Sequence, residues 1–333
     1  MCGILGYFGS NVQSFTSKVS LDAIAHRGPD FANATQGNLY FLGQTRLSIL
    51  DLSENGNQPM FSNDKKSVII FNGEIYNHLE LRNEFLPHQN FISTSDTETL
   101  LYGLIQYGTD FINKLNGIFA FSFYNIETKD FIIARDHFGI KPLYYFLGNK
   151  EICFSSELKA ILPFKNTLEI DKYALKNYIN FLWAPGELTP EKEFKKLLQG
   201  HFIKGNAEHV ANAEFIQYYN LPFCGKYLQK TENQWIDELE EKLIESVKRQ
   251  MLSDVPVGFF LSGGLDSSLL VAMAKKLYPN STIECFTLKT DEVEKEGFAS
   301  DFEYAKKVAT HLNVNLNVVE GQIDILKDFD KIV

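Results

Sequence analysis

The 333-residue sequence lacks an excess of basic residues, a hydrophobic run long enough to cross a membrane, and closely spaced cysteines. Lysine and arginine total 32 against 42 aspartate and glutamate residues, a net charge of −10. No basic field therefore attracts a phosphate backbone, so we expect no nucleic acid partner. The start of the chain lacks the basic residues and the unbroken apolar core of a secretory leader. We expect a cytoplasmic protein with no membrane partner.

Cysteine is scarce and widely spread. Cys2, Cys153, Cys224 and Cys285 show no C-x-x-C spacing, which argues against a zinc site and against a disulfide framework. The chain is instead rich in apolar and aromatic residues, at 44% and 14%, with 22% charged residues. This composition favours packed cores over disorder, and the length favours two domains.

The first 225 residues have the pattern of short strands in runs, with a few helices between them. Strands are predicted at residues 67–71, 117–124 and 131–134, and helices at 96–107 and 172–181. This order predicts packed antiparallel sheets with helices on their outer faces. We therefore place one domain, with its closing strands, at residues 1–225.

From residue 226 onward, strands and helices alternate. An amphipathic helix over residues 234–251 comes first, with apolar residues at three- and four-residue spacings. Strands are then predicted at 256–261, 283–288 and 314–319, and helices at 266–277 and 302–312. Alternation of this kind predicts a parallel, doubly wound α/β sheet in a second domain, residues 226–333. Three parallel strands make a poor independent domain, so we expect only a part of it here.

Cys2 becomes the first residue if Met1 is removed. Its α-amino group, of ordinary pKa about 8, then lies beside a thiol of ordinary pKa about 8.5. One residue could thus supply a nucleophile and, directly or through water, the base that activates it. From position alone, a small buried hydrophobic residue is the alternative interpretation.

Further motifs favour the catalytic interpretation of Cys2. They are Met1-Cys2-Gly3-Ile4, His26-Arg27-Gly28-Pro29-Asp30, Arg46-Leu47-Ser48-Ile49-Leu50-Asp51, Phe71-Asn72-Gly73-Glu74-Ile75-Tyr76-Asn77 and Ser95-Asp96-Thr97-Glu98. In this order they resemble the class II glutamine amidotransferases. The resemblance implies an α+β N-terminal-nucleophile fold, an αββα sandwich, that releases ammonia from glutamine at Cys2.

The resemblance also implies roles for the other residues of these motifs. Arg46 would hold the glutamine carboxylate and Asp96 the α-amino group, which suits a guanidinium fork and a carboxylate. Asn72 and Gly73 would stabilise the oxyanion, Asn72 with its side-chain NH₂ and Gly73 with a backbone N–H that a Cβ does not obstruct. The remaining pocket residues would be Leu47, Ser48, Ile49, Leu50 and Glu74.

Two of these motifs have structural alternatives. Asn72-Gly73 is also typical of a two-residue hairpin turn. Ser95-x-x-Glu98 is also typical of a capping box, in which Asp96 would simply favour the helix dipole.

Two further positions lie close to these motifs. Gln44 stands where many relatives carry a basic residue or His, which suggests a tuned pocket. We assign Arg27 and the turn at residues 28–30 a supporting role around the pocket.

A second motif, Ser262-Gly263-Gly264-Leu265-Asp266-Ser267-Ser268, follows a predicted strand and opens a predicted helix. Such a turn presents unpaired N–H groups and the positive end of a helix dipole, which suit phosphate oxygens; an ordinary helix cap is the alternative. The Walker A lysine is absent. The motif instead resembles the pyrophosphate loop of ATP pyrophosphatases. That resemblance implies pyrophosphate contacts from Ser262, Gly263, Gly264, Ser267 and Ser268, Mg²⁺ at Asp266, and adenosine contacts from Leu261 and Leu288.

The two motifs together resemble the glutamine-hydrolysing asparagine synthetases, with further matching stretches at residues 117–121, 135–145 and 155–160. The implied reaction converts ATP, aspartate, glutamine and water to AMP, pyrophosphate, asparagine and glutamate. Two alternatives remain open: ATP-dependent amidation of another carboxylate, such as a cell-envelope sugar acid, and a non-catalytic glutaminase-like binding subunit. The family's later glycine- and acid-rich loop is not found, so we expect a truncated synthetase half. A homodimer remains open.

Overall fold

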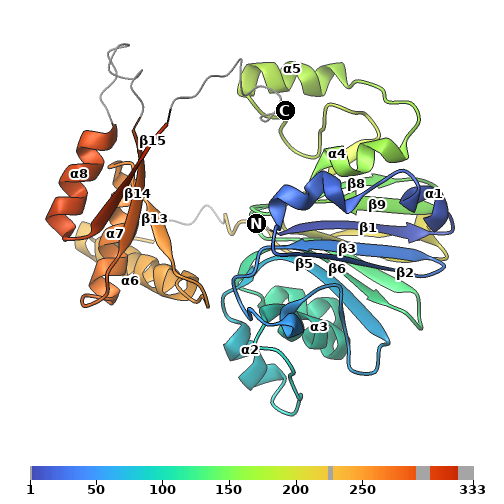
Figure 1. Cartoon of the computed structure of the whole chain (residues 1–333), viewed down its shortest axis with the longest axis horizontal. Coiled ribbons are helices and arrows are strands. Elements are labelled where there is room, and N and C mark those ends of the chain that lie inside the picture. Colours follow the sequence, from blue (N-terminus) through green and yellow to red (C-terminus); the bar gives the residue numbers. More distant parts are fainter. Residues whose placement is uncertain (1, 224–227, 290–300, 322–333) are drawn as a thin grey trace. The chain divides into compact units, whose positions relative to one another are not determined.

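The computed structural model describes residues 2–223, 228–289 and 301–321 (Figure 1). The chain divides into two compact units, Met1–Cys224 and Gly225–Val333. Within the described residues, no helix is long and apolar enough to cross a bilayer.

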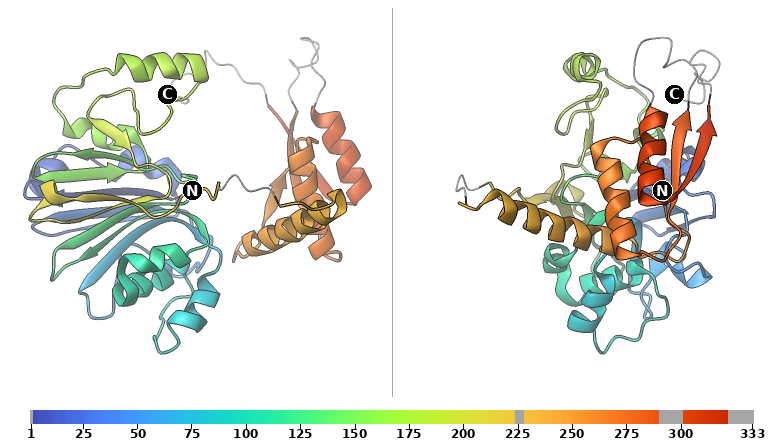
Figure 2. Two further views of the ribbon diagram at one scale, coloured as in Figure 1. Left: turned by 180° about the vertical axis from the view of Figure 1, so that it is seen from behind. Right: turned by 90° about the vertical axis from the view of Figure 1, so that its left-hand side faces the viewer.

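The first unit is built on two antiparallel sheets of six strands each (Figure 2). One sheet has the order β10-β8-β9-β1-β3-β2 and the other β12-β11-β7-β6-β5-β4. The strands of the first sheet are β1 (Gly3–Gly9), β2 (Phe31–Gln36), β3 (Tyr40–Arg46), β8 (Tyr144–Leu147), β9 (Glu151–Ser155) and β10 (Phe194–Lys196). Those of the second are β4 (Met60–Phe61), β5 (Ser67–Ile75), β6 (Gly117–Asn125), β7 (Asp130–Arg135), β11 (His201–Asn206) and β12 (Glu214–Gln217).

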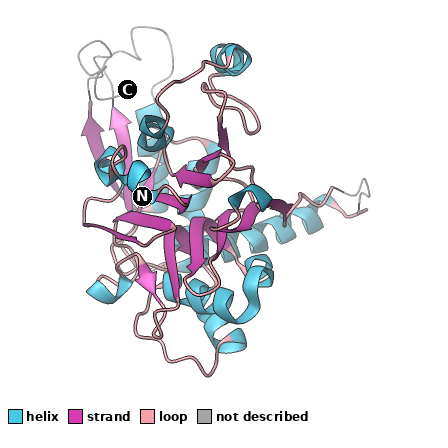
Figure 3. Cartoon of the chain, turned by 90° about the vertical axis from the view of Figure 1, so that its right-hand side faces the viewer, coloured by secondary structure: helices cyan, strands magenta, loops and turns pink. Residues whose placement is uncertain are grey.

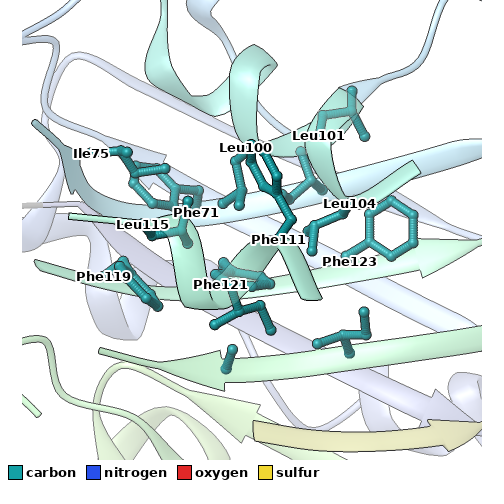
Figure 4. Close-up of a cluster of buried hydrophobic side chains, with 14 of the residues drawn as sticks. Phe71, Ile75, Leu100, Leu101, Leu104, Phe111, Leu115, Phe119, Phe121 and Phe123 are labelled. Atoms are coloured by element: carbon teal, nitrogen blue, oxygen red, sulfur yellow. The ribbon is translucent and has the colours of Figure 1, made fainter. Parts of the chain in front are cut away.

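The two sheets pack face to face because alternate residues on their strands are apolar. Ile4 and Phe8 of β1 share a buried cluster with Val68 and Ile70 of β5, as period-two alternation requires. The outer faces are covered by helices α1 (Val12–Thr16), α2 (His78–Phe85), α3 (Asp96–Tyr107) and α4 (Leu158–Ile161), and by the 3₁₀ helix η1 (Leu21–Arg27). Figure 4 shows the cluster of aromatic and aliphatic side chains between α3 and the second sheet. The predicted αββα sandwich is confirmed.

Strand β5 is longer than its predicted range of residues 67–71. Asn72 and Gly73 lie inside it, opposite Ala120 and Phe119 of β6, so the hairpin alternative for this dipeptide is wrong. A Cβ on Gly73 would lie 2.2 Å from the carbonyl oxygen of Ile118. The glycine is therefore required by the close approach of two paired strands and not by a turn.

Helices α3 and α5 (Lys172–Phe181) have the predicted bounds. The capping box predicted as the alternative for Ser95-x-x-Glu98 forms only in part. Ser95 Oγ does cap the helix, but it accepts from the N–H of Thr97 at 3.2 Å. The Glu98 carboxylate turns back to accept from the N–H groups of Ile92 and Ser93. It thereby fastens the preceding loop, because those two amides lie outside any helix or strand.

The second unit contains a three-stranded parallel sheet, as predicted (Figure 3). Its first strand is shorter than the predicted residues 256–261. The strands are β13 (Gly258–Phe260), β14 (Glu284–Lys289) and β15 (Asn315–Glu320), and the helices are α6 (Glu232–Gln250), α7 (Leu265–Leu277) and α8 (Asp301–Leu312). The buried cluster of this unit joins side chains from all three helices and the sheet.

Gly103 of α3 provides a test of the packing between α3 and the 3₁₀ helix η3 (Gly108–Lys114) that follows it. A Cβ at this position would lie 2.0 Å from the ring of Phe111. We expect Gly103→Ala to lower the free energy of unfolding by about 1–3 kcal/mol through overpacking, although alanine favours a helix by about 1 kcal/mol. Urea unfolding would measure the change. Phe111→Leu in the same chain should recover part of the loss, and a Gly103→Ala protein at least as stable as the wild type would refute the packing argument.

Candidate active site

The Cys2 thiol lies at the start of β1, against the loop that follows β3. Leu47 N–H donates to Cys2 Sγ at 3.4 Å, and the thiol contacts Leu47 O at 3.6 Å. The backbone of Cys2 is held by Arg27, whose Nε donates to its carbonyl oxygen at 3.0 Å. Arg27 is itself fixed by Glu157 at 2.9 Å. Burial raises the pKa of the Cys2 thiol, and the Leu47 N–H opposes that rise.

Arg46, the last residue of β3, organises the loop at residues 47–57. Only 5% of its surface is exposed, and all four N–H groups on its two terminal nitrogens are used inside that loop. The acceptors are the carbonyl oxygens of Leu50, Asp51 and Ser53 and the side-chain oxygen of Asn57. A Cβ on Gly56 would lie 2.2 Å from an Arg46 nitrogen, so the loop closes tightly on the guanidinium.

Two neighbouring carboxyl groups, those of half-buried Glu74 and buried Asp96, line one cavity. Asp96 accepts a hydrogen bond from Ile75 N–H at 2.8 Å and has Ser95 Oγ at 3.5 Å. Burial and the neighbouring Asp96 raise the pKa of Glu74 to about 8. Burial also raises the pKa of Asp96, and its hydrogen bonds oppose that rise. Since Asp96 has the donors, the shared proton belongs on Glu74 at neutral pH.

A single cavity brings most of the predicted glutamine-site residues together. Those that line it are Cys2, Arg46, Leu47, Ile49, Leu50, Gly73, Glu74 and Asp96. Ser48 lies outside the cavity, with its N–H bound to Asp30 at 2.8 Å. Asn72 is buried on β5, 1% exposed. Five lining residues are additions from the structure: Gly56, Gln58, Phe71, Ser95 and Thr97.

Lys141 is a charged residue near the cavity, within residues 135–145. That stretch resembles the asparagine synthetases, but no motif marked Lys141 as a site residue. It is 7% exposed, and burial lowers its pKa while the charges of Glu74 and Cys2 oppose that shift. The backbone N–H of Lys141 donates to Asp136 Oδ2 at 2.9 Å. Asp136 also accepts from Phe119 N–H at 3.2 Å, and Phe119 pairs with Gly73. Hydrogen bonds therefore fasten Lys141 to the strand beside the cavity.

The predicted nucleotide loop lies between β13 and α7 in the second unit. Gly264 is the N-cap of α7 and, since glycine has no side chain, it makes no capping bond to the helix. Its carbonyl oxygen instead accepts from the hydroxyls of Ser267 and Ser268, at 3.2 and 2.7 Å. Ser262 Oγ lies 3.1 Å from Ser267 Oγ. The start of this helix, with exposed Ser262 and half-buried Ser267 and Ser268 beside it, suits phosphate oxygens.

The other residues of the predicted ATP site are Gly263, Leu261 and Leu288. Gly263 has φ +79, and a Cβ there would meet the backbone of α8 at 2.4 Å, so this glycine is required by packing. Leu261 is 1% exposed and Leu288 is 51% exposed. Leu261 N–H donates to the carbonyl oxygen of Phe286, in the middle of β14.

Asp266 lies in the first turn of α7, exposed to solvent. Among the described residues no group of three or more His, Cys, Asp and Glu side chains is placed to hold a metal. One carboxylate beside a phosphate site fits Mg²⁺, which keeps several waters and uses substrate phosphate oxygens as ligands.

The fold of the first unit and the cavity beside Cys2 define a class of protein. It is an αββα sandwich with a cysteine directly before β1 and a polar pocket next to it. Residues 1–219 match the family model described as a glutamine amidotransferase domain. This match covers more than half of the chain, and the chain belongs to that family. Residues 238–333 match the model described as asparagine synthase.

Several curated proteins are similar to this chain over most of its length. An asparagine synthetase [glutamine-hydrolyzing] 1 of Bacillus subtilis is 37% identical over 100% of this chain and 52% of its own length. A putative asparagine synthetase 2 of Methanocaldococcus jannaschii is 35% identical, over 86% and 59%. The amidase chyE of Penicillium rubens is 31% identical, over 90% and 46%. The chain spans about half the length of the curated relatives it matches.

The raised pKa of Glu74 predicts a pH-dependent stability of the first unit. The folded protein keeps a proton that unfolded Glu74 releases near its ordinary pKa of about 4.3, so the free energy of unfolding falls as pH rises toward about 8. Glu74→Gln removes this loss. Melting curves between pH 5 and 8 should therefore show the wild type losing more stability than the variant. Exposed Glu84 supplies the control, as Glu84→Gln. Parallel curves for wild type and Glu74→Gln would refute the assignment.

The position of Lys141 predicts the reactivity of Cys2. Removing this cation should raise the pKa of the thiol, because the positive charge favours the thiolate. The pH profile of Cys2 alkylation by iodoacetamide, followed on the Cys2 peptide by mass spectrometry, reports that pKa. Lys141→Met should move the midpoint upward, and Lys141→Arg should leave it near that of the wild type. Equal midpoints for all three proteins would mean that the Lys141 charge does not reach the thiol.

Proposed function

We propose that this chain hydrolyses glutamine at Cys2 and supplies the ammonia to an ATP-dependent asparagine synthetase reaction. The observation that carries the proposal is the single cavity that joins the Cys2 thiol to Arg46, Gly73 and Asp96. The chain's membership of the glutamine amidotransferase family and the match of residues 238–333 to asparagine synthase support it.

In the proposed reaction, the α-amino group of Cys2, freed by removal of Met1, takes the thiol proton directly or through water. The sulfur attacks the side-chain amide carbon of glutamine, and Gly73 N–H and the Asn72 amide stabilise the oxyanion that forms. Collapse breaks the C–N bond, ammonia leaves with the proton, and water hydrolyses the thioester to glutamate. Arg46 and Asp96 would bind the carboxylate and the ammonium of the substrate.

The second unit would supply the energy for amide formation. Residues 262–268 would bind the pyrophosphate part of ATP, with Mg²⁺ at Asp266 and the adenosine near Leu261 and Leu288. The side-chain carboxylate of aspartate would attack the α-phosphorus and release pyrophosphate. Ammonia would then attack the acyl carbon and release AMP. A cytoplasmic location and a homodimer belong to this proposal.

Cys2→Ala provides the main test of the proposal. Glutaminase activity, measured as glutamate formed from glutamine, should fall to background because the nucleophile is lost. In the full-length protein the variant should keep amide formation with added ammonia, since the synthetase site does not use Cys2. N-terminal sequencing should find Cys2 first. Undiminished glutaminase activity in Cys2→Ala would refute the assignment, and a wild type without glutaminase activity would favour the binding-subunit alternative.

The identity of the amidated carboxylate needs its own comparison, because relatives include both asparagine synthetases and a protein named amidase chyE. Pyrophosphate release by the full-length protein with aspartate, and with other carboxylates such as a sugar acid, separates the two enzyme alternatives. Aspartate should give the largest rate. A larger rate with another acid would replace asparagine as the product.

A further inference from the structure

Three polar side chains are enclosed between the two sheets of the first unit. Gln44 of β3, Asn72 of β5 and Ser122 of β6 are 0%, 1% and 0% exposed. Each lies on the strand face that points into the sandwich. Gln44 is two residues after Leu42 and Asn72 is two residues after Ile70, and Leu42 and Ile70 belong to the cluster between the sheets. Ser122 has the same alternation on β6. The sandwich interior therefore contains a polar group within an apolar layer.

These side chains have unpaired atoms. Gln44 Oε1, both terminal atoms of Asn72 and Ser122 Oγ have no hydrogen-bond partner in the part of the chain that the structure describes. Buried polar atoms are almost always paired with protein or with ordered water, because an unpaired one is costly. Unpaired atoms on three side chains of one interior layer indicate a partner that these side chains share.

Strand register brings the three side chains together. Asn72 lies opposite Ala120 and Ile70 opposite Ser122, so Asn72 and Ser122 are diagonal neighbours on one face of the sheet. Gln44 reaches this place from the other sheet, where its Nε2 lies 3.5 Å from the carbonyl oxygen of Phe71, the residue before Asn72.

We propose that Gln44, Asn72 and Ser122 hold one buried water molecule, and that this water fixes the orientation of the Asn72 amide for catalysis. The water donates to Gln44 Oε1 and Asn72 Oδ1 and accepts from the Ser122 hydroxyl, which is the usual number of bonds for a buried water. With its oxygen held, Asn72 presents Nδ2–H to the oxyanion. The catalytic part rests on the proposed function, and Gln44 and Ser122 act as positioning residues through Asn72.

Ser122→Ala tests the arrangement. Loss of one oxyanion donor lowers kcat by about 100- to 1000-fold, so loss of its orientation should lower kcat for glutamine hydrolysis by at least about tenfold, with KM nearly unchanged. Ser122→Thr, which keeps the hydroxyl, should recover most of the rate. In an Asn72→Ala background, Ser122→Ala should have no further effect, because Ser122 acts only through Asn72.

A matched control separates positioning from general damage. Ser62 is also buried, but its hydroxyl bonds to Asp64 and Ser67 in its own hairpin. Ser62→Ala should lower stability and leave kcat unchanged. The rate of Cys2 alkylation by iodoacetamide should be equal in all variants, since the thiol is not altered. A Ser122→Ala enzyme with wild-type kcat, or one whose effect adds to that of Asn72→Ala, would overturn the positioning role.

The water itself can be observed without any activity. A crystal structure of the chain should show an ordered water within hydrogen-bond distance of Asn72 and Ser122, and no water there in Ser122→Ala. A dry interior in the wild type would overturn the proposal. A chain that lacks glutaminase activity would overturn the proposed function, and the crystal structure would still decide whether this cluster is a solvent site.

Discussion

The face-to-face packing of the two sheets is the constraint on which the site depends. Cys2 directly precedes β1 of one sheet, and Asn72, Gly73 and Glu74 lie near the end of β5 of the other. Neither sheet contains a site alone. The apolar faces of β1 and β5 must bury each other, and this burial places the thiol beside the strand end. Under the proposed function, the oxyanion donors thus lie on a strand and the nucleophile lies directly before one, and strands hold geometry better than loops do.

Under the proposed function, the charges around the cavity would suit the zwitterionic end of glutamine. Arg46 is a fixed cation on one side, and Asp96, supported by its donors, is the anion on the other. A third full charge from Glu74 would disturb this balance, and its raised pKa keeps it neutral near pH 7. Lys141 offsets the negative charge that a thiolate adds beside Glu74. Burial makes each of these charges more effective, because the surrounding dielectric is low.

The residue pattern predicted packed antiparallel sheets and helices α3 and α5, because alternation is a local signal. The αββα sandwich and most of the cavity lining followed from the family resemblance of the motifs. The sequence did not predict what depends on pairing across the chain. Asn72-Gly73 has the composition of a hairpin, but β6 pairs with it and extends the strand. Glu98 has the spacing of a capping box, but the loop before α3 offers it two better donors. The position of the Lys141 charge near the cavity and the enclosure of Gln44 between the sheets depend on loop and sheet packing. A single sequence gives no signal for either.

Arg46 has two demands on one side chain. Its terminal N–H groups already bind four acceptors within residues 50–57, so a substrate carboxylate that binds at these terminal nitrogens must displace one of them. The exchange is favourable, since an ionised acceptor binds a guanidinium more strongly than a neutral carbonyl does. The released carbonyl oxygen must then find water or move. Under the proposed function, glutamine binding is therefore coupled to a shift of the loop at residues 47–57, and that loop also carries the Leu47 backbone that holds the thiol. Substrate recognition and nucleophile position are thus linked through a single side chain.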